Sequence, residues 1–312
     1  MSVPADKVIH PWAGVGGIDS AGTVPATPST APSAPSLKTP RVFTCNSLWQ
    51  HQQPLLEALS ELYGDRQLDS FGGSYGWSVR YRQIEDYESI NIHTLREYLE
   101  AFQAGGTKLP YLRHLSVNKA MPELRKHLRH PKEFGPNWAD HPMLDRISGP
   151  EIFIGQKDTV FGHVHQDQVN VHVGFVQLQG EKEFVVFPPD DGQYLSIFAG
   201  REFPYQLRNS RVRYSDLENY EDFPLLRHAR PQRIVLRAGE ALLLPADWWH
   251  TTRNLTDSVS YSVRIVNGSN ARQCLQSHLE GVPRWLRKAW GQTPDLICSI
   301  SRSLAGCRNH PR

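Results

Sequence analysis

Three polar side chains have the types and spacing of a mononuclear metal site. His165 and Asp167 lie two residues apart in the run His163-Val-His165-Gln-Asp167, and His250 follows far downstream. Residues two apart on a β-strand point to the same face, so His165 and Asp167 can aim at one point. Two imidazoles and one carboxylate on one face of an octahedron leave the other positions open, which is the arrangement of non-haem iron(II) oxygenases.

The elements around these residues are predicted to be strands. Strand-like runs cover residues 152–154, 160–165, 169–178, 183–187, 234–236, 241–244 and 259–266, with Gly155, Gly180 and Pro188-Pro189 between them. Many short strands separated by turn signals are typical of a sandwich or a barrel. His165 closes one of these runs, and His250 follows the apolar run that ends at Pro245.

The part of the chain before residue 151 mixes helices with strands. Leucines at helical spacing predict a helix over residues 51–64, and Thr94 is the predicted N-cap of a helix that stops at Gly105-Gly106. We also expect a turn and short strand over 71–82, a strand over 109–115 and a short helix that opens at Pro122.

Composition divides the chain into three parts. Residues 1–40 are expected to be a flexible leader, because a sequence so rich in Pro, Ser, Thr and Ala cannot bury enough apolar surface to order itself. Residues 41–270 are expected to form the catalytic domain, and residues 271–312 a C-terminal helical extension. Trp285 and Trp290 of that extension would pack either against the barrel or against a second subunit in a homodimer.

Charge and cysteine usage bound the setting of the protein. The 312 residues are 39% hydrophobic and 21% charged, and a formal net charge of +2 argues against a nucleic-acid partner. Cys45, Cys274, Cys298 and Cys307 lack metal-type spacing and are interpreted as free thiols in a reducing compartment. No apolar run could cross a membrane and no secretory pattern is seen, so a cytoplasmic location is expected.

Longer segments resemble a known family. The run Phe175-Val-Gln-Leu-Gln-Gly-Glu-Lys-Glu-Phe-Val-Val-Phe-Pro-Pro189 is similar to the strand-turn-strand that follows the metal pair in JmjC-type, cupin-like dioxygenases. Asp191-Gly-Gln-Tyr-Leu195 and Gly239-Glu-Ala-Leu-Leu-Leu-Pro-Ala-Asp-Trp-Trp-His250 resemble later segments of that family. The similarity spans about residues 85 to 266. Similar members include the asparaginyl hydroxylase acting on hypoxia-inducible factor and the tRNA wybutosine hydroxylase.

The resemblance implies a fold, a metal and a co-substrate. The fold would be a mainly β double-stranded β-helix, a cupin-like jelly-roll with N-terminal α/β elements and C-terminal helices. His165, Asp167 and His250 would hold Fe(II), and 2-oxoglutarate and dioxygen would be co-substrates. Lys182 matches the family lysine that pairs with the distal carboxylate of 2-oxoglutarate, and Tyr111 matches a tyrosine whose hydroxyl reaches it. The alternatives are an exposed turn lysine and a packed core tyrosine.

Several positions depart from the family pattern. Asp167 and Gln177 are ten residues apart where the family usually has eight, and a bulge in the strand is expected to absorb the two extra residues. The altered register leaves Asn170, His172 and Trp248 as candidate contacts to substrate or co-substrate. The alternative for His172 is a strand histidine whose hydrogen bonds are satisfied.

Further departures concern the ligand-binding groups. Gly162 stands where relatives often have a Thr or Ser that helps to hold the keto-acid, and Arg264 stands where they often have Asn. An inward Arg264 would pair with a carboxylate of 2-oxoglutarate or of substrate, and the alternative is a pair with a surface acid. A His163/His165 pair would be the ordinary cupin pattern, but the glutamate that this pattern wants soon afterwards is missing, so the pair with Asp167 is preferred.

The predicted activity is hydroxylation of a C–H bond. The substrate would be an amino-acid residue in a peptide or protein, a free amino acid or a small natural-product intermediate. One alternative is removal of an N-methyl group from a modified side chain. The other is a non-catalytic cupin-like binding protein, against which the retention of His165, Asp167, His250 and Lys182 speaks.

Overall fold

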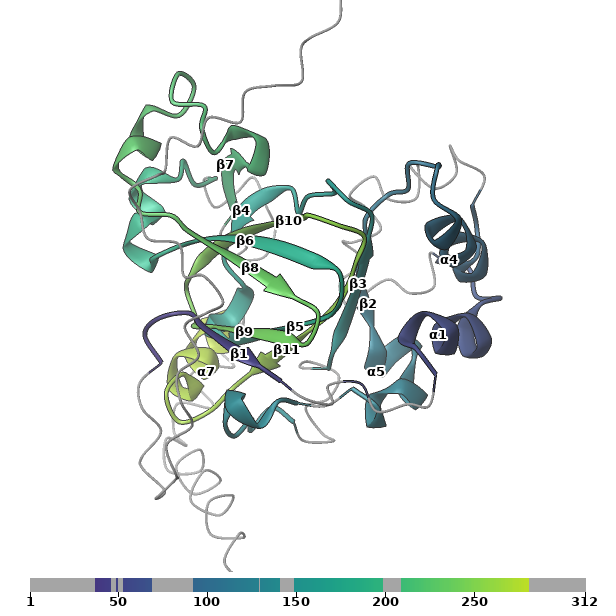
Figure 1. The fold of residues 1–312 in the computed structure, drawn as a ribbon. Coiled ribbons are helices and arrows are strands. Elements are labelled where there is room, and N and C mark those ends of the chain that lie inside the picture. The colour runs from purple at the N-terminus through teal and green to yellow at the C-terminus, as the bar shows by residue number, and fades with distance from the viewer. Residues whose placement is uncertain are drawn as a thin grey trace, which may run out of the picture.

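Two antiparallel sheets face each other and form the centre of the protein (Figure 1). The computed structural model describes residues 37–45, 49, 53–68, 92–128, 130–140, 149–198 and 209–280. Its strands are β1 Arg41–Thr44, β2 Leu112–Ser116, β3 Glu151–Gly155, β4 His163–His165, β5 His172–Gln179, β6 Glu181–Phe187, β7 Asn209–Arg213, β8 Gln232–Arg237, β9 Glu240–Leu244, β10 Trp249–Asn254 and β11 Ser258–Ile265.

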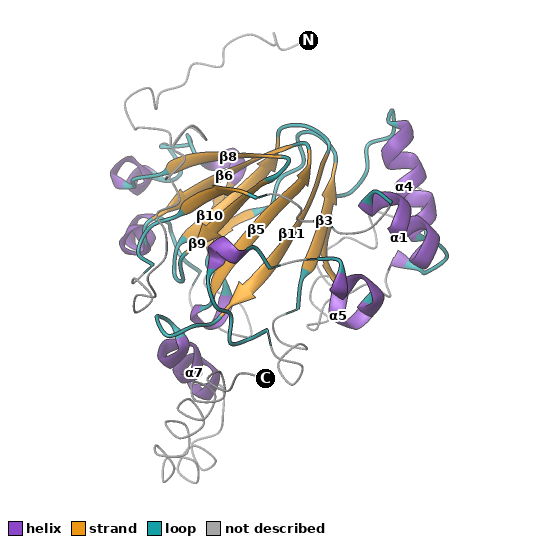
Figure 2. Cartoon of the chain, turned by 60° about the horizontal axis from the view of Figure 1, so that its bottom comes forward, coloured by secondary structure: helices purple, strands orange, loops and turns teal. Residues whose placement is uncertain are grey.

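The order of the strands is that of a jelly-roll. One sheet has the order β1-β9-β5-β11-β3-β2 and the other has the order β7-β4-β10-β6-β8. Neighbours such as β5 and β11, or β6 and β10, are far apart in the sequence but pair over most of their lengths. The mainly β, cupin-like jelly-roll predicted from the sequence is therefore confirmed (Figure 2).

Short helices surround the sheets. They are α1 Leu55–Tyr63, α4 Leu95–Ala104, α5 Val117–Ala120, η2 Pro122–Lys126, η3 Lys132–Phe134, η4 Gln168–Asn170, η5 Pro189–Tyr194, η6 Tyr214–Asp216, η7 Pro224–His228 and α7 Ala271–Glu280. The cap predicted for α4 is confirmed, because the Thr94 side chain accepts the Glu97 N–H while the Glu97 carboxylate accepts the Thr94 N–H. No helix in the described part of the chain is long and apolar enough to span a membrane.

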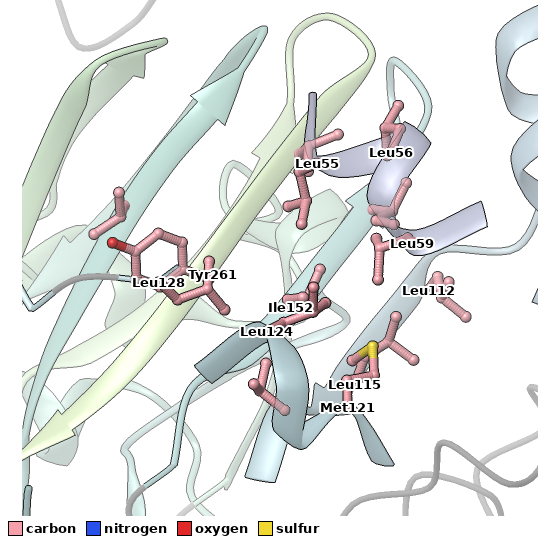
Figure 3. Packing of buried hydrophobic residues seen from close by; sticks show 14 of the residues in the cluster. Leu55, Leu56, Leu59, Leu112, Leu115, Met121, Leu124, Leu128, Ile152 and Tyr261 are labelled. Carbon is pink, nitrogen blue, oxygen red and sulfur yellow. The ribbon is translucent and has the colours of Figure 1, made fainter. Parts of the chain in front are cut away.

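The helices α1, α4, α5 and η2 cover the outer face of the six-stranded sheet. Figure 3 shows leucines of α1 and η2 against Ile152 of β3 and Tyr261 of β11. Alternation along a strand then turns the intervening residues of β3 and β11 toward the opposite sheet. Because one face of β3 and β11 packs against the outer helices, the side chains of the other face point into the space between the sheets.

The structure differs from the predicted elements at four places. His250 does not simply follow an earlier strand but lies inside a strand of its own, β10. The polar strand β7 was missed, and β4 is shorter than predicted. The extra residues after Asp167 form the turn η4, in which Val169 and Asn170 have left-handed φ values of 57° and 53°, while β5 pairs without interruption from His172 to Gln177. The strand bulge expected there was wrong, and the turn strand predicted over 71–82 lies outside the described residues.

Candidate metal centre

His165, Asp167 and His250 converge at one point between the sheets. β4 lies beside β10, and His165 is directly opposite His250 in the ladder. The two imidazole centroids are 4.3 Å apart, and His250 Nε2 lies 3.6 Å from Asp167 Oδ2. One ligand atom from each of the three residues lies within 4.8 Å of the others. In the described part of the chain this is the one such group of three.

Backbone carbonyls orient both imidazoles. His165 Nδ1 donates to the carbonyl of His163 at 3.1 Å, and His250 Nδ1 donates to the carbonyl of Trp248 at 3.4 Å. The proton on Nδ1 leaves the Nε2 lone pair of each ring available to a metal. Burial, and then the neighbouring His250 imidazole, lowers the pKa of His165 well below its ordinary value, which keeps this ring in the neutral form that binds metals.

Asp167 supports the fit of a metal ion to these residues. Its Oδ2 atom is buried and has no hydrogen-bond partner among the residues that the structure describes. A buried carboxylate oxygen without a partner is costly, and a cation would satisfy it. Two neutral imidazoles and one carboxylate are a donor set typical of mononuclear iron(II), and these three residues would hold it.

His163 lies outside this group. Its ring meets Phe198 edge to face at a centroid distance of 5.7 Å, and the ladder between β4 and β7 shifts register between His163 and His165. The geometry therefore brings together the three residues that were preferred from the sequence, and leaves the alternative pair apart.

Lys182 is buried between the sheets at 4% exposure, so it is not an exposed turn lysine. Its ammonium donates to Tyr111 Oη at 3.0 Å and to Ser260 Oγ at 2.5 Å. Within the described residues neither of its hydrogen-bond partners is a carboxylate. Burial lowers the pKa of Lys182 to about 7 and raises the pKa of Tyr111. The ammonium is thus a buried cation that an anionic ligand would stabilise.

The metal-binding residues and Lys182 stand at two ends of one inner surface. In the β6–β10 ladder His250 is opposite Val186, Thr252 is opposite Phe184, and Asn254 is opposite Lys182. Side chains directly opposite each other share a face of the sheet. At about 3.3 Å per residue, His250 and Asn254 are separated by about 13 Å of strand. The long lysine side chain can shorten this span.

Arg264 pairs with a buried acid rather than with a surface one. Its Nη2 donates to Glu151 Oε1 at 3.1 Å, and His114 Nδ1 lies 2.9 Å from the other carboxylate oxygen. Burial alone would raise the pKa of Glu151, but the charges of Arg264 and His114 lower it to about 2. The predicted role of Arg264 toward a ligand stays a prediction.

His172, which was predicted to contact substrate or co-substrate, makes hydrogen bonds within the protein instead. His172 accepts the Ala246 N–H on Nδ1 at 2.8 Å, and its Nε2 lies 2.8 Å from Ser269 Oγ. Both ring nitrogens are thus engaged, and burial lowers the pKa of His172 to about 4. These contacts agree with the alternative of a satisfied strand histidine.

Asn170 and Trp248 also make contacts that hold the fold together. Asn170 Nδ2 donates to Asp247 Oδ1 at 2.6 Å, and its Oδ1 accepts the hydroxyl of Ser277 in α7. The Trp248 indole is 5% exposed and donates to the Lys38 carbonyl at 3.2 Å. Each residue therefore joins the metal-site strands to a more distant segment.

Sequence reasoning missed Ser260, His114 and Glu151. Ser260 shares its face of β11 with Ser258 and Ser262, and this alternation is visible in the sequence. The contact with Lys182, however, depends on how the two sheets pack. His114 and Glu151 come from separate strands, and no local pattern pairs them.

Comparisons with known proteins agree with this geometry. The family model described as a cupin-like domain matches residues 39–265. The chain is 26% identical over 222 residues to the 2-oxoglutarate and iron-dependent oxygenase JMJD4 of Gallus gallus, covering 68% of this chain and 50% of that protein.

Relatives with other names match as well. The chain is 28% identical over 192 residues to the tRNA wybutosine-synthesizing protein 4 of Gibberella zeae, covering 58% of this chain and 17% of that protein. It is 31% identical over 103 residues to the HSPB1-associated protein 1 of Bos taurus, covering 32% of this chain and 20% of that protein. The chain thus spans half or less of the length of these three relatives.

Proposed function

Because the chain belongs to the cupin-like domain family, we propose that it is an iron(II)- and 2-oxoglutarate-dependent oxygenase. The observation that carries the proposal is the group of His165, Asp167 and His250, whose ligand atoms lie within 4.8 Å of one another. The buried, unpartnered Asp167 Oδ2 supports a cation at this point. The relative from Gallus gallus is named as an oxygenase of this class.

The inner surface of the jelly-roll fits a keto-acid with two carboxylates. One end of 2-oxoglutarate would bind beside the metal ligands, and its distal carboxylate would accept hydrogen bonds from Lys182 and Tyr111. The buried ammonium has no carboxylate partner among the described residues, so a bound carboxylate would favour its protonated form. Arg264, which pairs with Glu151, would serve a carboxylate of 2-oxoglutarate or of the substrate.

Bound iron(II) together with 2-oxoglutarate and dioxygen supplies the oxidative chemistry, in which the keto-acid is converted to succinate and carbon dioxide while a substrate C–H bond becomes C–OH. The residues of the chain supply positions rather than proton transfer. His165 and His250 keep Nε2 directed inward through their Nδ1–carbonyl bonds. Phe161 stacks on His165 at 4.6 Å and Phe175 meets His250 at 5.6 Å, so apolar rings exclude water from the ligands.

The reaction class can be tested without knowing the substrate. Purified chain would be given Fe(II), 2-oxoglutarate and ascorbate, and succinate would be measured over time. We expect slow succinate formation that Asp167→Asn lowers by at least about 100-fold, because the metal loses a charged ligand. The matched control is Asp158→Asn, which changes an exposed aspartate paired with Arg253 and should keep the wild-type rate. Equal rates for Asp167→Asn and Asp158→Asn, or no succinate from the wild type, would contradict the proposal.

The substrate is an amino-acid residue in a peptide or protein, a free amino acid, or a related small molecule. The relatives act in different processes by their names, so the fold alone leaves this class broad. Mass spectrometry of candidate substrates separates the outcomes. One added oxygen supports hydroxylation, loss of a methyl group indicates demethylation, and tight keto-acid binding without succinate indicates a binding protein.

A further inference from the structure

A histidine–carboxylate pair beside the metal centre has no part in the proposed reaction. Glu151 Oε2 lies 2.9 Å from His114 Nδ1, while Oε1 accepts a hydrogen bond from Arg264 at 3.1 Å. Glu151 is ionised, because Arg264 and His114 offset its burial and lower its pKa to about 2. An ionised carboxylate only accepts hydrogen bonds, so His114 carries its proton on Nδ1. In the neutral ring Nε2 then offers a lone pair.

The backbone at His114 is built to direct this side chain. The β2–β3 ladder shifts register between Leu112 and Leu115, and His114 has a φ of 58°. A non-glycine residue in the left-handed region is strained, and such strain is common at functional sites. The hydrogen bond between His114 Nδ1 and Glu151 Oε2 holds the ring in place.

The His114 ring lies against both ends of the inner surface. It meets Phe161 at a centroid distance of 5.6 Å, and Phe161 stacks on the metal-binding residue His165. It also meets Phe153 at 5.1 Å, and Phe153 lies 5.5 Å from the Lys182 ammonium. The His114 side chain remains 34% exposed, and within the described residues Nε2 has no hydrogen-bond partner. A molecule bound beside Phe153 and Phe161 could therefore reach Nε2.

We propose that His114 is a substrate-binding residue whose Nε2 accepts a hydrogen bond from an amide N–H of the substrate. Glu151 and Arg264 are positioning residues that hold the ring in the required tautomer and direction. This inference rests on the oxygenase function proposed above and narrows its substrate to peptides, proteins or amino-acid amides. A tertiary amide, which has no N–H, would be rejected because Nε2 would lose its donor.

The test uses the full chain loaded with Zn(II) and 2-oxoglutarate, so that no turnover occurs. Calorimetry first establishes binding of 2-oxoglutarate, whose failure would count against the oxygenase proposal itself. Histidines are then labelled with ¹⁵N, and the His114 signal is assigned from its loss in His114→Gln. The probes are N-acetyl amino-acid methylamides with each of the common side chains, in which both amides carry an N–H. Each is paired with an analogue in which both amides are methylated to tertiary amides and have no N–H.

At least one secondary amide should shift the His114 Nε2 resonance, and its N-methylated analogue should bind about tenfold or more weakly. Glu151→Gln should weaken the same amide while leaving 2-oxoglutarate affinity unchanged. His228→Gln, an exposed histidine on η7, is the control and should bind like the wild type. If 2-oxoglutarate binds but no amide moves the His114 resonance, or if both amide series bind equally, the assignment of His114 is overturned. The comparison of the two amide series uses only the wild-type chain, so it holds even where a variant does not fold.

Discussion

At the level of single residues, the buried ammonium of Lys182 affects both the stability of the protein and its affinity for an anionic ligand. Lys182 lies between the sheets with hydroxyl partners from Tyr111 and Ser260. Desolvation lowers its pKa from the ordinary value of 10.5 to about 7, so the folded chain binds fewer protons than the unfolded chain over this range. In the ligand-free protein, the charge on Lys182 therefore lowers the free energy of unfolding. This loss is largest below pH 7 and becomes smaller as the pH rises.

Replacing this lysine should separate ligand binding from stability. Lys182→Met keeps a chain of similar length but has no charge. We expect the variant to lose at least about 100-fold in 2-oxoglutarate affinity, because the distal carboxylate loses a buried charge-assisted contact. Without ligand, it should unfold at higher denaturant than the wild type at pH 7. Calorimetry and urea titration measure the two effects.

The same residue predicts a pH dependence. Between pH 7 and 9 the wild-type free energy of unfolding should rise relative to that of Lys182→Met by about 2 kcal/mol, since each pKa unit is worth about 1.4 kcal/mol. Lys157→Met, which changes an exposed lysine after β3, provides the control. A difference that stays constant over this range would contradict the buried, titrating ammonium.

Residue types and spacing predicted the three residues that converge between the sheets better than the residues around them. Alternation along an extended chain pointed to His165 and Asp167, the spacing of the sequence added His250, and the family resemblance added Lys182. By contrast, the contact of Ser260 with Lys182 crosses between sheets, and His114 reaches Glu151 through a bulge. Those contacts depend on tertiary packing, which no local pattern encodes.

At the level of elements, β11 carries small polar side chains toward the ligand. Ser258, Ser260 and Ser262 lie on one face of β11, which pairs with β3 and β5 in the six-stranded sheet. Ser258 Oγ accepts from Gln177, whereas Ser260 Oγ accepts from Lys182. Gly162, where relatives often have a hydroxyl residue, has open space around its α-carbon. Ser260 thus provides a hydroxyl near the ammonium that position 162 cannot provide.

Ser260→Ala should therefore weaken 2-oxoglutarate about tenfold, in line with the loss of one hydrogen bond near a charge. Ser258→Ala, on the same face but bonded to Gln177, should leave the affinity unchanged. Pyruvate, which lacks the distal carboxylate, should bind both variants equally well. Calorimetry with the Mn(II)-loaded chain gives all these affinities, and an equal loss in the two variants would show a general packing effect.

Local sequence signals predicted α4 more accurately than they predicted the strands around the site. The sequence predicted Thr94 as the N-cap of α4, and the structure adds the reciprocal hydrogen bond from the Thr94 N–H to the Glu97 carboxylate. β10 was missed because most of its residues are buried, so Trp249-His-Thr-Thr lacks the alternation of a half-buried strand. The insertion after Asp167 became the turn η4 instead of a bulge, because two left-handed residues absorb the extra length before pairing begins.

The cap of α4 predicts a change in stability without a change in function. Thr94→Ala should lower the free energy of unfolding by about 1 kcal/mol, and Thr94→Ser should restore most of it. Succinate formation per folded molecule should stay at the wild-type value, because α4 packs on the outer face of the six-stranded sheet. Urea titration monitored by tryptophan fluorescence measures the loss, and an unchanged midpoint would contradict the role of the cap.

At the level of the whole molecule, the ligand would join both sheets. The metal ligands His165 and His250 belong to the five-stranded sheet, while Ser260 belongs to the six-stranded sheet. Mn(II) and 2-oxoglutarate together should therefore raise the melting temperature, with about 2.7 kcal/mol of added stability at a ligand concentration 100 times Kd. EDTA should abolish most of the shift caused by 2-oxoglutarate. A keto-acid shift of the same size in EDTA would mean that the two ligands bind independently.

The distance along the chain between the metal ligands has a consequence for folding. His165 and His250 are 85 residues apart (250 minus 165), and β5, β6, β7, β8 and β9 lie between them. Closing so long a loop is slow, since most of the intervening strands must find partners first. If these residues hold iron, a nascent or partly unfolded chain would lack a complete site, and the metal would be captured only once the jelly-roll has closed. Redox-active iron would thereby be kept from chains that could not yet use it.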